Sequence, residues 1–363
     1  MNTIDLEHWL TSLKKSISDF LSQLLDKNNF YHYSLSGDIY PPQIKWGLGN
    51  AVFASKIYYM LEELTSKKKK NLADFIKSFQ NSKGYIHDPL VQRISKLRRY
   101  YNAFRTCDFE NIFNEQTRRA ETRQAFAALC CLKSKPNQPF LHIPYTESDI
   151  ENYVHRLNWN LAWGAGSHIS HLLFFLKKNS ELYHINDDKS EKLIQYVIDL
   201  VNDKYRRDDG SWYLSSAKMP HFQKVNAAMK MMIGFDAAGK LDFDNEIKLI
   251  DLCLAAINEG HACNHFNVIC VLYHCSRKTD YKRKEIRQYC LNQLSHYRQY
   301  YWPDSGGFSF FKGKANHNYY GAIISRGLKE PDIHGTVLFL WGISLIVKML
   351  EYDHLIQLNA PIT

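Results

Sequence analysis

Four charged residues near one another in the chain could bind an anionic substrate and transfer a proton. Arg118, Arg119, Glu121 and Arg123 lie in one short segment, and the spacing of Arg119 and Arg123 would place both on one face of a helix. A guanidinium group binds the oxygens of a diphosphate or a carboxylate through two parallel hydrogen bonds. Glu121 is a candidate acid or base. The alternative is a solvated helix start with local ion pairs.

Histidine and cysteine alternate with other residues in a second segment. It contains His261, Cys263 and His265, and a further histidine, His334, follows Asp332 near the C-terminus. Imidazole and thiolate groups are ligand types that zinc prefers. The alternative is that His261 and His265 form a helix cap and a hydrogen-bonded core group, with Cys263 as a small buried apolar residue.

Two kinds of helical segment must position these residues. Half-polar segments with one apolar face, typical of surface helices, occur at 4–24 and near 66–80, 146–158, 190–206, 243–258 and 282–300. Segments that are apolar on nearly every face, as expected of buried helices, begin near 46, 124, 163, 226, 267 and 335. The alternation predicts an all-α protein with six outer and six inner helices, an α6/α6 toroid formed by residues 1–363 as a single domain.

A recurring turn phrase supports this repeat. A small or polar pair, a glycine and then an aromatic residue occur at Gly84-Tyr85, at Gly210-Ser211-Trp212 and at Gly306-Gly307-Phe308. Glycine adopts a positive φ without steric cost, so each phrase predicts a tight turn between an outer and an inner helix.

In such a toroid the starts of the inner helices would converge on one cavity. Besides the residues above, this predicts a set of substrate-binding side chains: Lys45, Trp46, Arg119, Arg123, Trp163, His168, Lys224, Asn226 and Asn267. The glycines after Trp163 follow no strand, so they indicate close packing of two helices rather than a dinucleotide loop.

The turn phrases resemble the glycine-aromatic repeats of the terpenoid cyclase and protein prenyltransferase superfamily. The segment from Gly306 to Leu345, with Asp332 and His334, resembles the end of a prenyltransferase β-subunit. The resemblance implies a toroid with its active cavity at the end where the inner helices start. It covers most of the chain as architecture and about the last sixty residues as motif.

The resemblance also implies a zinc site and a partner subunit. In the prenyltransferases an aspartate and a cysteine on one inner helix join a histidine on the last inner helix to bind zinc. Here His261 and Cys263, or Cys263 and His265, would take the paired role, and His334 would be the third ligand. The family's aspartate is absent, and His334 follows Asp332 at a shorter spacing than in the family.

A terpene cyclase that protonates its substrate needs an acidic cluster instead. The nearest string, Asp242-Phe243-Asp244-Asn245, lacks the last acidic residue and precedes an outer helix. A carboxylate there is better interpreted as a helix N-cap.

Composition limits the location and the partners. The chain has a formal net charge of +9, which favours anionic partners. The sequence has no nucleic-acid-binding motif, no uninterrupted run of apolar residues long enough for a membrane span and no signal peptide. Eight cysteines, several of them in apolar helical segments, are typical of free thiols in a reducing cytoplasm.

Three functions follow from these observations. The first is an enzyme resembling prenyltransferases and terpenoid cyclases that acts on a small anionic substrate such as an isoprenoid diphosphate, with Glu121, Asp332 and His334 as catalytic candidates. The second is a lyase or hydrolase of acidic glycans, in which Arg123 and Lys224 would neutralise a uronate. The third is a toroid that binds a ligand without catalysis.

Overall fold

The computed structural model describes residues 3–107, 109, 112, 115–215, 218–241, 243–256 and 260–362. Helices make up 60% of the structure, and the sheet in the described part has two strands, so the all-α prediction is confirmed. The elements are α1 (Thr3–Leu24), α2 (Leu48–Leu61), α3 (Ser66–Lys77), α4 (Pro89–Thr106), α6 (Gln116–Cys131), α7 (Glu147–Arg156), α8 (Ala162–Tyr183), α9 (Asp187–Tyr205), α10 (His221–Ala237), α11 (Glu246–Leu254), α12 (Ala262–Ser276), α13 (Arg283–Tyr297), η1 (Arg298–Tyr300), β1 (Asn318–Tyr319), β2 (Ala322–Ile323) and α14 (Ile333–Leu350).

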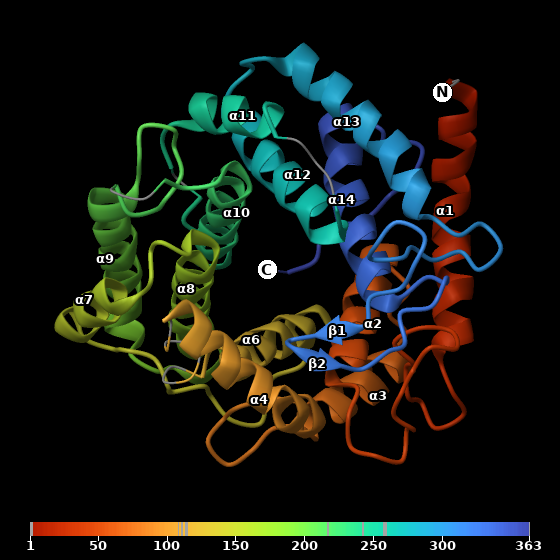
Figure 1. The fold of residues 1–363 in the computed structure, drawn as a ribbon, viewed down its shortest axis with the longest axis horizontal. Helices are drawn as coiled ribbons and strands as arrows, with labels where there is room; N and C mark the ends of the chain where they lie inside the picture. Colours follow the sequence, from red (N-terminus) through yellow and green to blue (C-terminus); the bar gives the residue numbers. More distant parts are fainter. Residues whose placement is uncertain are drawn as a thin grey trace.

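Six helices contact one another in a closed cycle. The contacts run from α2 to α6, α8, α10, α12 and α14, and from α14 back to α2. Figure 1 shows these helices around the centre of the molecule, with α1, α7, α9, α11 and α13 outside them. Burial follows this arrangement, since α2 is buried along almost its whole length, whereas α3 buries only Leu72, Ala73 and Ile76.

The glycine-aromatic phrases form the turns that end outer helices. Isolated antiparallel bridges close each turn, from Gln80 to Ile86, from Arg206 to Trp212 and from Tyr301 to Phe308. The three glycines have φ values of 84°, 83° and 82°, so the predicted positive φ is confirmed. A fourth turn of this kind, closed by Leu25 and Tyr31 after α1, has Asn29 at φ 61°.

Small residues allow α8 and α10 to pack closely, as the sequence predicted for the glycines after Trp163. A Cβ at Gly166 would lie 3.1 Å from Cβ of Lys230, and one at Gly234 would lie 2.8 Å from Cα of Ser170. The two backbones therefore approach more closely than larger side chains would permit.

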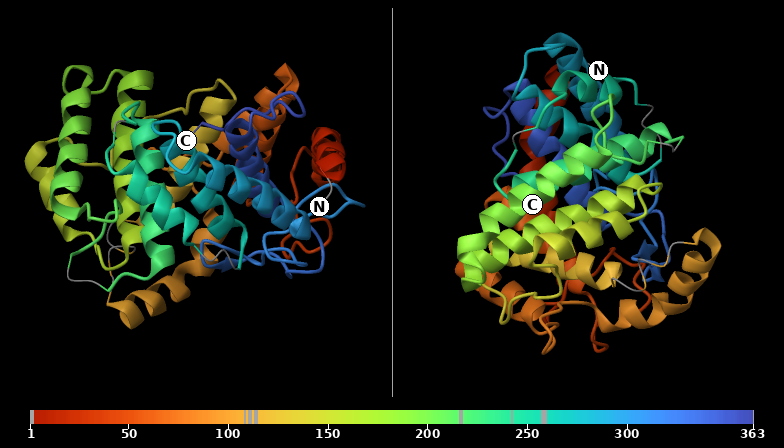
Figure 2. Two further views of the ribbon diagram at one scale, coloured as in Figure 1. Left: turned by 90° about the horizontal axis from the view of Figure 1, so that it is seen from above. Right: turned by 90° about the vertical axis from the view of Figure 1, so that its left-hand side faces the viewer.

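Different segments cover the two ends of the helical cycle. Strands β1 and β2 pair in antiparallel register, with Tyr319 opposite Ala322, and this hairpin contacts α4. At the other end, the backbone N–H of Asn359 donates to the carbonyl of Met60, in the last turn of α2. Figure 2 shows the C-terminus on the side of the molecule away from α4.

Helix α14 is the most apolar element. Among the described helices, it alone is long and apolar enough to cross a membrane, but 78% of it is buried inside the protein. Its apolar surface is therefore covered by the neighbouring helices α2, α12 and α13.

Candidate functional site

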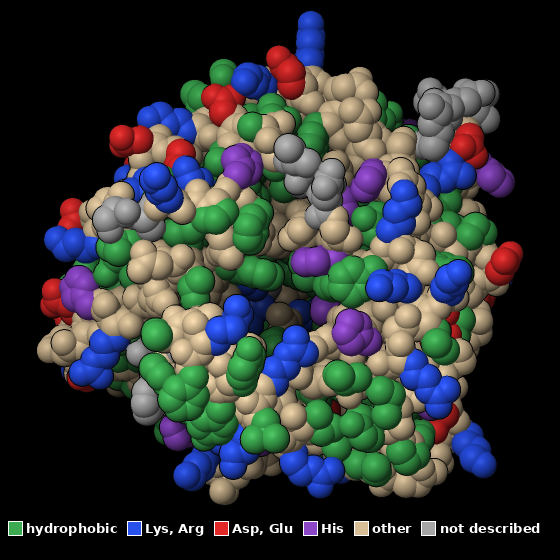
Figure 3. All heavy atoms as spheres, viewed as in Figure 1, with side chains coloured by type: hydrophobic (Ala, Val, Ile, Leu, Met, Phe, Trp, Pro, Cys, Tyr) green, Lys and Arg blue, Asp and Glu red, His purple; other side chains and the backbone are tan. Residues whose placement is uncertain are grey.

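A cavity of about 290 Å³ lies inside the cycle of six helices. Every helix of the cycle contributes to its wall, and the β1–β2 hairpin contributes as well. Figure 3 shows a hollow near the middle of the face seen in Figure 1, bordered by Lys, Arg and His side chains. The lining residues are Phe53, Arg123, Gln124, Trp163, Ser170, His171, Met229, Lys230, Ile233, Cys263, Phe266, Asn267, Asn318, Tyr319, Tyr320, His334, Leu338 and Trp341.

Arg123 is the more deeply buried of the two cationic residues, Arg123 and Lys230, that line this wall. It lies in the middle of α6, is 4% exposed and packs on the ring of Phe174, with Cζ 5.0 Å from the ring centre. Its Nε and Nη2 atoms are buried and have no hydrogen-bond partner in the described structure. Burial lowers the pKa of Arg123 to about 10, so the side chain stays charged at neutral pH.

Two lysines add positive charge to the same region. Lys230 of α10 lines the cavity, and Lys56 of α2 lies behind it, where Nζ donates to Oε1 of Gln124. Burial, reinforced by the charge of Arg123, lowers the pKa of Lys230 to about 8 and that of Lys56 to about 7. None of the lining residues is Asp or Glu. The lining residues therefore concentrate positive charge, and the carboxyl of Asp236, whose charge acts on Arg123, lies outside the lining.

His334 enters the cavity from the first turn of α14. Its ring stacks on Phe53, with ring centres 4.6 Å apart. Nδ1 lies 3.3 Å from Oη of Tyr33 and 3.5 Å from Nδ2 of Asn316. Asn316 Nδ2 also donates to Oη of Tyr33, which leaves the tyrosine proton available for Nδ1.

The hydroxyl of Tyr33 is thus the hydrogen-bond donor to Nδ1, since the two amide hydrogens of Asn316 go to Oη of Tyr33 and to the carbonyl of Asn318. This arrangement favours the imidazole tautomer that carries its proton on Nε2. Burial lowers the pKa of His334 to about 3, so the ring is neutral at physiological pH. His334 can therefore offer an N–H donor to a bound group.

Aromatic rings form much of the remaining wall. Phe266 and Trp341 pack with ring centres 4.3 Å apart, and Phe53 meets Tyr319 edge to face at 5.9 Å. The amides of Gln124 and Asn267 and the hydroxyl of Ser170 lie among them. The cavity combines cationic and hydrogen-bonding groups with apolar surface, as ligand sites generally do.

The structure brings together part of the residue set predicted from the sequence. Arg123, Trp163, Cys263, Asn267 and His334 line one cavity. The other predicted residues are not among the lining residues, and their contacts give the reasons.

Glu121 lies in a buried polar network between α4 and α6. Its Oε2 accepts a hydrogen bond of 2.6 Å from Nε2 of Gln92, and Oε1 faces the backbone N–H of Asp88 at 3.4 Å. Burial and the nearby Asp88 carboxyl raise the pKa of Glu121 well above its usual range. The network explains why Glu121 does not reach the cavity, where a catalytic acid was expected.

Asp332 is the N-cap of α14 rather than a group facing the cavity. Its Oδ1 accepts from the backbone N–H of Gly335 at 2.8 Å, and Oδ2 accepts from those of Phe310 at 2.8 Å and Asn316 at 3.0 Å. The carboxyl thereby fastens the segment before the hairpin to the start of the last helix. All of these contacts are to backbone groups of the protein itself, so the residue has a structural role.

The proposed zinc ligands have other partners. His261 stacks on Phe310 with ring centres 5.0 Å apart, and Nε2 of His265 contacts Oη of Tyr300 at 3.1 Å. Burial raises the pKa of the Cys263 thiol to about 12. No group of three His, Cys, Asp or Glu residues in the described ranges is arranged to hold a metal ion.

The donor set at His334 also differs from that of a metal ligand. A histidine that binds zinc through one ring nitrogen normally donates its other N–H to an acceptor, whereas Nδ1 of His334 faces the hydroxyl of Tyr33 as a donor. The described residues therefore do not fit zinc. His265 has the hydrogen-bonded core position that the alternative interpretation expected.

Two predicted residues stabilise the segment before α2. Lys45 Nζ donates to the carbonyl of Ser78 at 2.8 Å. Trp46 is buried, and its Nε1 donates to the carbonyl of Pro41 at 3.2 Å. Both side chains therefore hold loops together outside the cavity.

The remaining predicted residues bond to neighbouring side chains. Arg119 donates to Nδ1 of His168. Lys224 forms an ion pair of 2.8 Å with Asp209 of the second turn phrase. Asn226 accepts a hydrogen bond of 2.6 Å from Nδ2 of Asn267, so it supports a lining residue without lining the cavity itself.

The acidic string near α11 does not cap the helix through a carboxylate. Asp242 lies outside the described residues, and Asp244 forms an ion pair of 3.5 Å with Arg206. The N-cap is Asn245, whose side chain makes no capping hydrogen bond.

Lys230 and Lys56 were missed from the sequence because they lie beyond the first turns of their helices. Each is a single charged residue in an otherwise apolar segment: Ala-Met-Lys230-Met-Met and Ala-Ser-Lys56-Ile-Tyr. An isolated charge in a buried helix rarely occurs without a partner, and this signal could have identified both.

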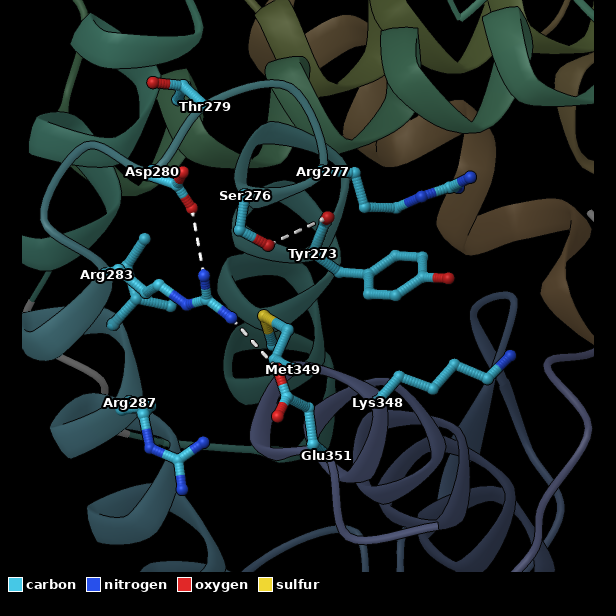
Figure 4. Close-up of a pocket in the computed structure, with 11 residues that line it drawn as sticks. Tyr273, Ser276, Arg277, Thr279, Asp280, Arg283, Arg287, Lys348, Met349 and Glu351 are labelled. Atoms are coloured by element: carbon cyan, nitrogen blue, oxygen red, sulfur yellow. Dashed lines mark hydrogen bonds and ion pairs between the residues drawn. The ribbon is translucent and has the colours of Figure 1, made fainter.

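A second cationic pocket, of about 200 Å³, lies on the outer part of the molecule (Figure 4). Two of its arginines already have hydrogen-bond partners. Arg283 bonds to Asp280 and Glu351 at 3.2 and 2.9 Å, and Arg287 donates to the carbonyl of Leu350 at 2.9 Å. Since the carboxylates of Asp280 and Glu351 offset the positive charge here, the central cavity is the stronger candidate site.

Comparison with known proteins gives no independent indication of function, because no family model, no curated protein and no solved structure matches this chain.

Proposed function

We propose that residues 1–363 form one α6/α6 toroid and that its central cavity binds a small anionic substrate, with Arg123 and Lys230 as the principal contacts. The observation that carries this proposal is the buried guanidinium of Arg123, whose Nε and Nη2 have no hydrogen-bond partner, beside Lys230 and among lining residues without Asp or Glu. Buried charges are costly unless paired. An oxyanion in the cavity would offset that cost.

The chemistry of the wall favours a phosphate, diphosphate or carboxylate. Arg123, Lys230 and the Nε2 edge of His334 are donors, and a guanidinium matches two oxygens of such a group at once. The rings of Phe266 and Trp341 would hold an apolar part of the same molecule. An isoprenoid diphosphate has both parts, which agrees with the family resemblance.

A catalytic role follows from the same groups. As a diphosphate leaves, negative charge grows on its oxygens, and the preorganised cations of Arg123 and Lys230 would stabilise that charge. Aromatic faces such as that of Trp341 would stabilise a carbocation left behind. We therefore favour a transferase or cyclase over a binding protein without catalysis.

Elimination from a small uronate is the second candidate, because Arg123, Tyr319 and His334 lie in one cavity. The side chains that would act as the base in this elimination are less suitable. His334 presents an N–H rather than a free lone pair, and burial raises the pKa of Tyr319 well above its usual range, so neither is a ready base at neutral pH. Hydrolysis of a glycan usually requires two carboxylates, which the described wall lacks.

The test is calorimetric titration of the protein with inorganic pyrophosphate and with an isoprenoid diphosphate. We expect binding that weakens at least tenfold in Arg123→Met and in Lys230→Met. Arg119→Met is the matched control, because Arg119 is equally buried in the same helix but bonds to His168 and does not line the cavity. Absence of binding to either compound, or equal losses in the control, would contradict the proposal.

A further inference from the structure

Helix α4 exposes a group of large apolar side chains. Leu97 is 83% exposed, Phe104 68% and Tyr101 66%, and Tyr100 beside them is 42% exposed. No other described helix has so many large hydrophobic residues exposed. Exposed apolar side chains gathered on one helix indicate a surface that meets a partner.

The exposed residues form a stripe with basic residues on both sides. Leu97, Tyr101 and Phe104 follow the spacing of one helix face. On that geometry, Lys96 lies to one side of the stripe and Arg105 to the other, and both are exposed. Helix α4 contains no Asp or Glu from Pro89 to Thr106, so its surface charge has one sign.

The helix protrudes from the body of the protein. Figure 2 shows α4 extending outward at the same end of the molecule as the β1–β2 hairpin. Its inner face packs there, since a Cβ at Gly321 in the hairpin would lie 3.5 Å from Cβ of Ser95. In the region of α4 in Figure 3, hydrophobic and basic side chains lie side by side and acidic ones are scarce.

A basic groove of about 520 Å³ runs along the flank of the same helix. Arg93, Lys96 and Arg99 line it from α4, and Arg118 faces them from α6. Glu115, the acidic residue among its lining residues, is paired with Arg118. The groove is wide enough for a phosphate-bearing group and carries excess positive charge.

We propose that α4 docks on the surface of an anionic membrane, with Leu97, Tyr101 and Phe104 inserted among the lipid headgroups and the basic groove on the lipid phosphates. A helix with an apolar stripe, basic flanks and aromatic residues lies in the membrane interface. The long stems of Lys96 and Arg105 allow their charges to stay at the headgroup level. This inference does not depend on what the central cavity binds.

Charge and side-chain type favour a membrane over the other occupants. A second copy of this chain would place one basic α4 surface against another, and like charges repel across an interface. The whole chain also has a formal net charge of +9, which adds to the repulsion between copies. Tyrosines beside leucine and phenylalanine suit the boundary between headgroups and acyl chains. The anionic leaflet supplies both the apolar layer and the phosphates.

The test is co-sedimentation of the full-length protein with vesicles of phosphatidylcholine alone and with vesicles that also contain phosphatidylserine. We expect at least tenfold tighter binding to the anionic vesicles. Leu97→Ser with Phe104→Ser should weaken that binding at least tenfold, and so should Lys96→Glu with Arg105→Glu. Circular dichroism melting checks that each variant is folded.

Matched controls distinguish binding through the α4 surface from nonspecific hydrophobic or electrostatic binding to vesicles. Leu141→Ser with Ile247→Ser removes two comparably exposed apolar residues elsewhere, at 52% and 45%. Lys67→Glu with Lys70→Glu makes the same change of charge on α3. Both controls should bind like the parent protein.

Three outcomes would overturn the proposal. They are no binding of the parent to anionic vesicles, equal losses in the controls, or unchanged binding when the stripe is altered. A parent that dimerises through α4 in sedimentation equilibrium, and does not bind vesicles, would assign the surface to a second copy instead.

Discussion

Gly306, in the turn after the last outer helix, lies directly against Ser16 in the first. A Cβ added to Gly306 would be 2.0 Å from the Ser16 carbonyl oxygen, and the residue has a φ of 82°. Gly210 has the same relation to the next outer helix, where a Cβ would lie 2.8 Å from Cγ of Leu249. These turn glycines therefore pack against the neighbouring outer helix. Through Gly306, the turn after α13 contacts the first helix, α1.

We expect Gly306→Ala to destabilise the protein by about 3 kcal/mol, because the left-handed backbone costs about 1 kcal/mol and the overlap with Ser16 costs more. Gly313→Ala is the control, since Gly313 has a φ of 73° but nothing within 4 Å of the added Cβ. It should cost about 1 kcal/mol. Urea unfolding of both variants measures the difference, and equal losses would show that contact with α1 is unimportant.

Asp332 should contribute to stability by holding the loop before the hairpin. In Asp332→Asn the amide nitrogen cannot accept, so backbone donors of Phe310 and Asn316 would lose a partner. We expect a loss of about 3 kcal/mol in chemical unfolding. Thr146→Ala, which removes an exposed cap from α7, should cost about 1 kcal/mol. A loss in Asp332→Asn no larger than this would contradict the anchoring role.

The sequence predicted the helices and three of the turns because both depend on local chemistry. Apolar periodicity marks a buried face, and glycine marks a positive φ. The fourth turn, after α1, was missed because Asn29 replaces the glycine. Asparagine tolerates the left-handed region through local hydrogen bonds of its side chain, so the same geometry occurs without the same residue.

The site was predicted less completely, since depth along a helix and backbone partners are not local properties. The prediction placed the cavity at the first turns of the inner helices, whereas Arg123 and Lys230 lie deeper. Glu121 and Asp332 have the residue type of a catalytic acid. Their burial against Gln92 and against backbone N–H groups follows from packing between distant segments, which the sequence pattern does not show.

Lys230 should make the unliganded protein less stable at neutral pH. Its pKa in the folded protein, about 8, is lower than the value of about 10.4 expected for an unfolded lysine. The unfolded state therefore binds more protons between these values, and the penalty is full below pH 8 and disappears as the pH rises through 10.4. Lys230→Met should be more stable than the parent at pH 7, with a difference that shrinks towards pH 10.

Urea unfolding at several pH values measures this difference, and Lys67→Met, a substitution of an exposed lysine, is the control. The comparison of variant with parent cancels the titration of cysteines and tyrosines that both proteins share. A Lys230→Met variant that is less stable at pH 7, or whose difference does not change with pH, would contradict a charged and unpaired lysine.

Anion affinity should fall as Lys230 loses its proton. Sulfate is a suitable probe because its own charge is constant above pH 6. We expect weaker binding at pH 9 than at pH 7 in the parent, and a smaller decrease in Lys230→Arg, because arginine stays charged while Lys56, whose pKa is about 7, loses its proton in both proteins. Calorimetry measures the affinity for sulfate at the two pH values. A parent affinity that is independent of pH would show that Lys230 does not contact the anion.

His334 should remain neutral well into the acid range and carry its proton on Nε2. Burial lowers its pKa to about 3, and the hydroxyl of Tyr33, which accepts from Asn316, donates to Nδ1. Nitrogen-15 NMR of labelled histidine distinguishes the two tautomers, and we expect the Nε2–H form with no titration between pH 5 and 8. In Tyr33→Phe the tautomer preference should weaken, because a donor to Nδ1 is removed. An Nδ1–H signal in the parent protein would instead leave Nε2 as a free lone pair, and His334 would then be suited to act as a base or a metal ligand rather than as a donor to a bound anion.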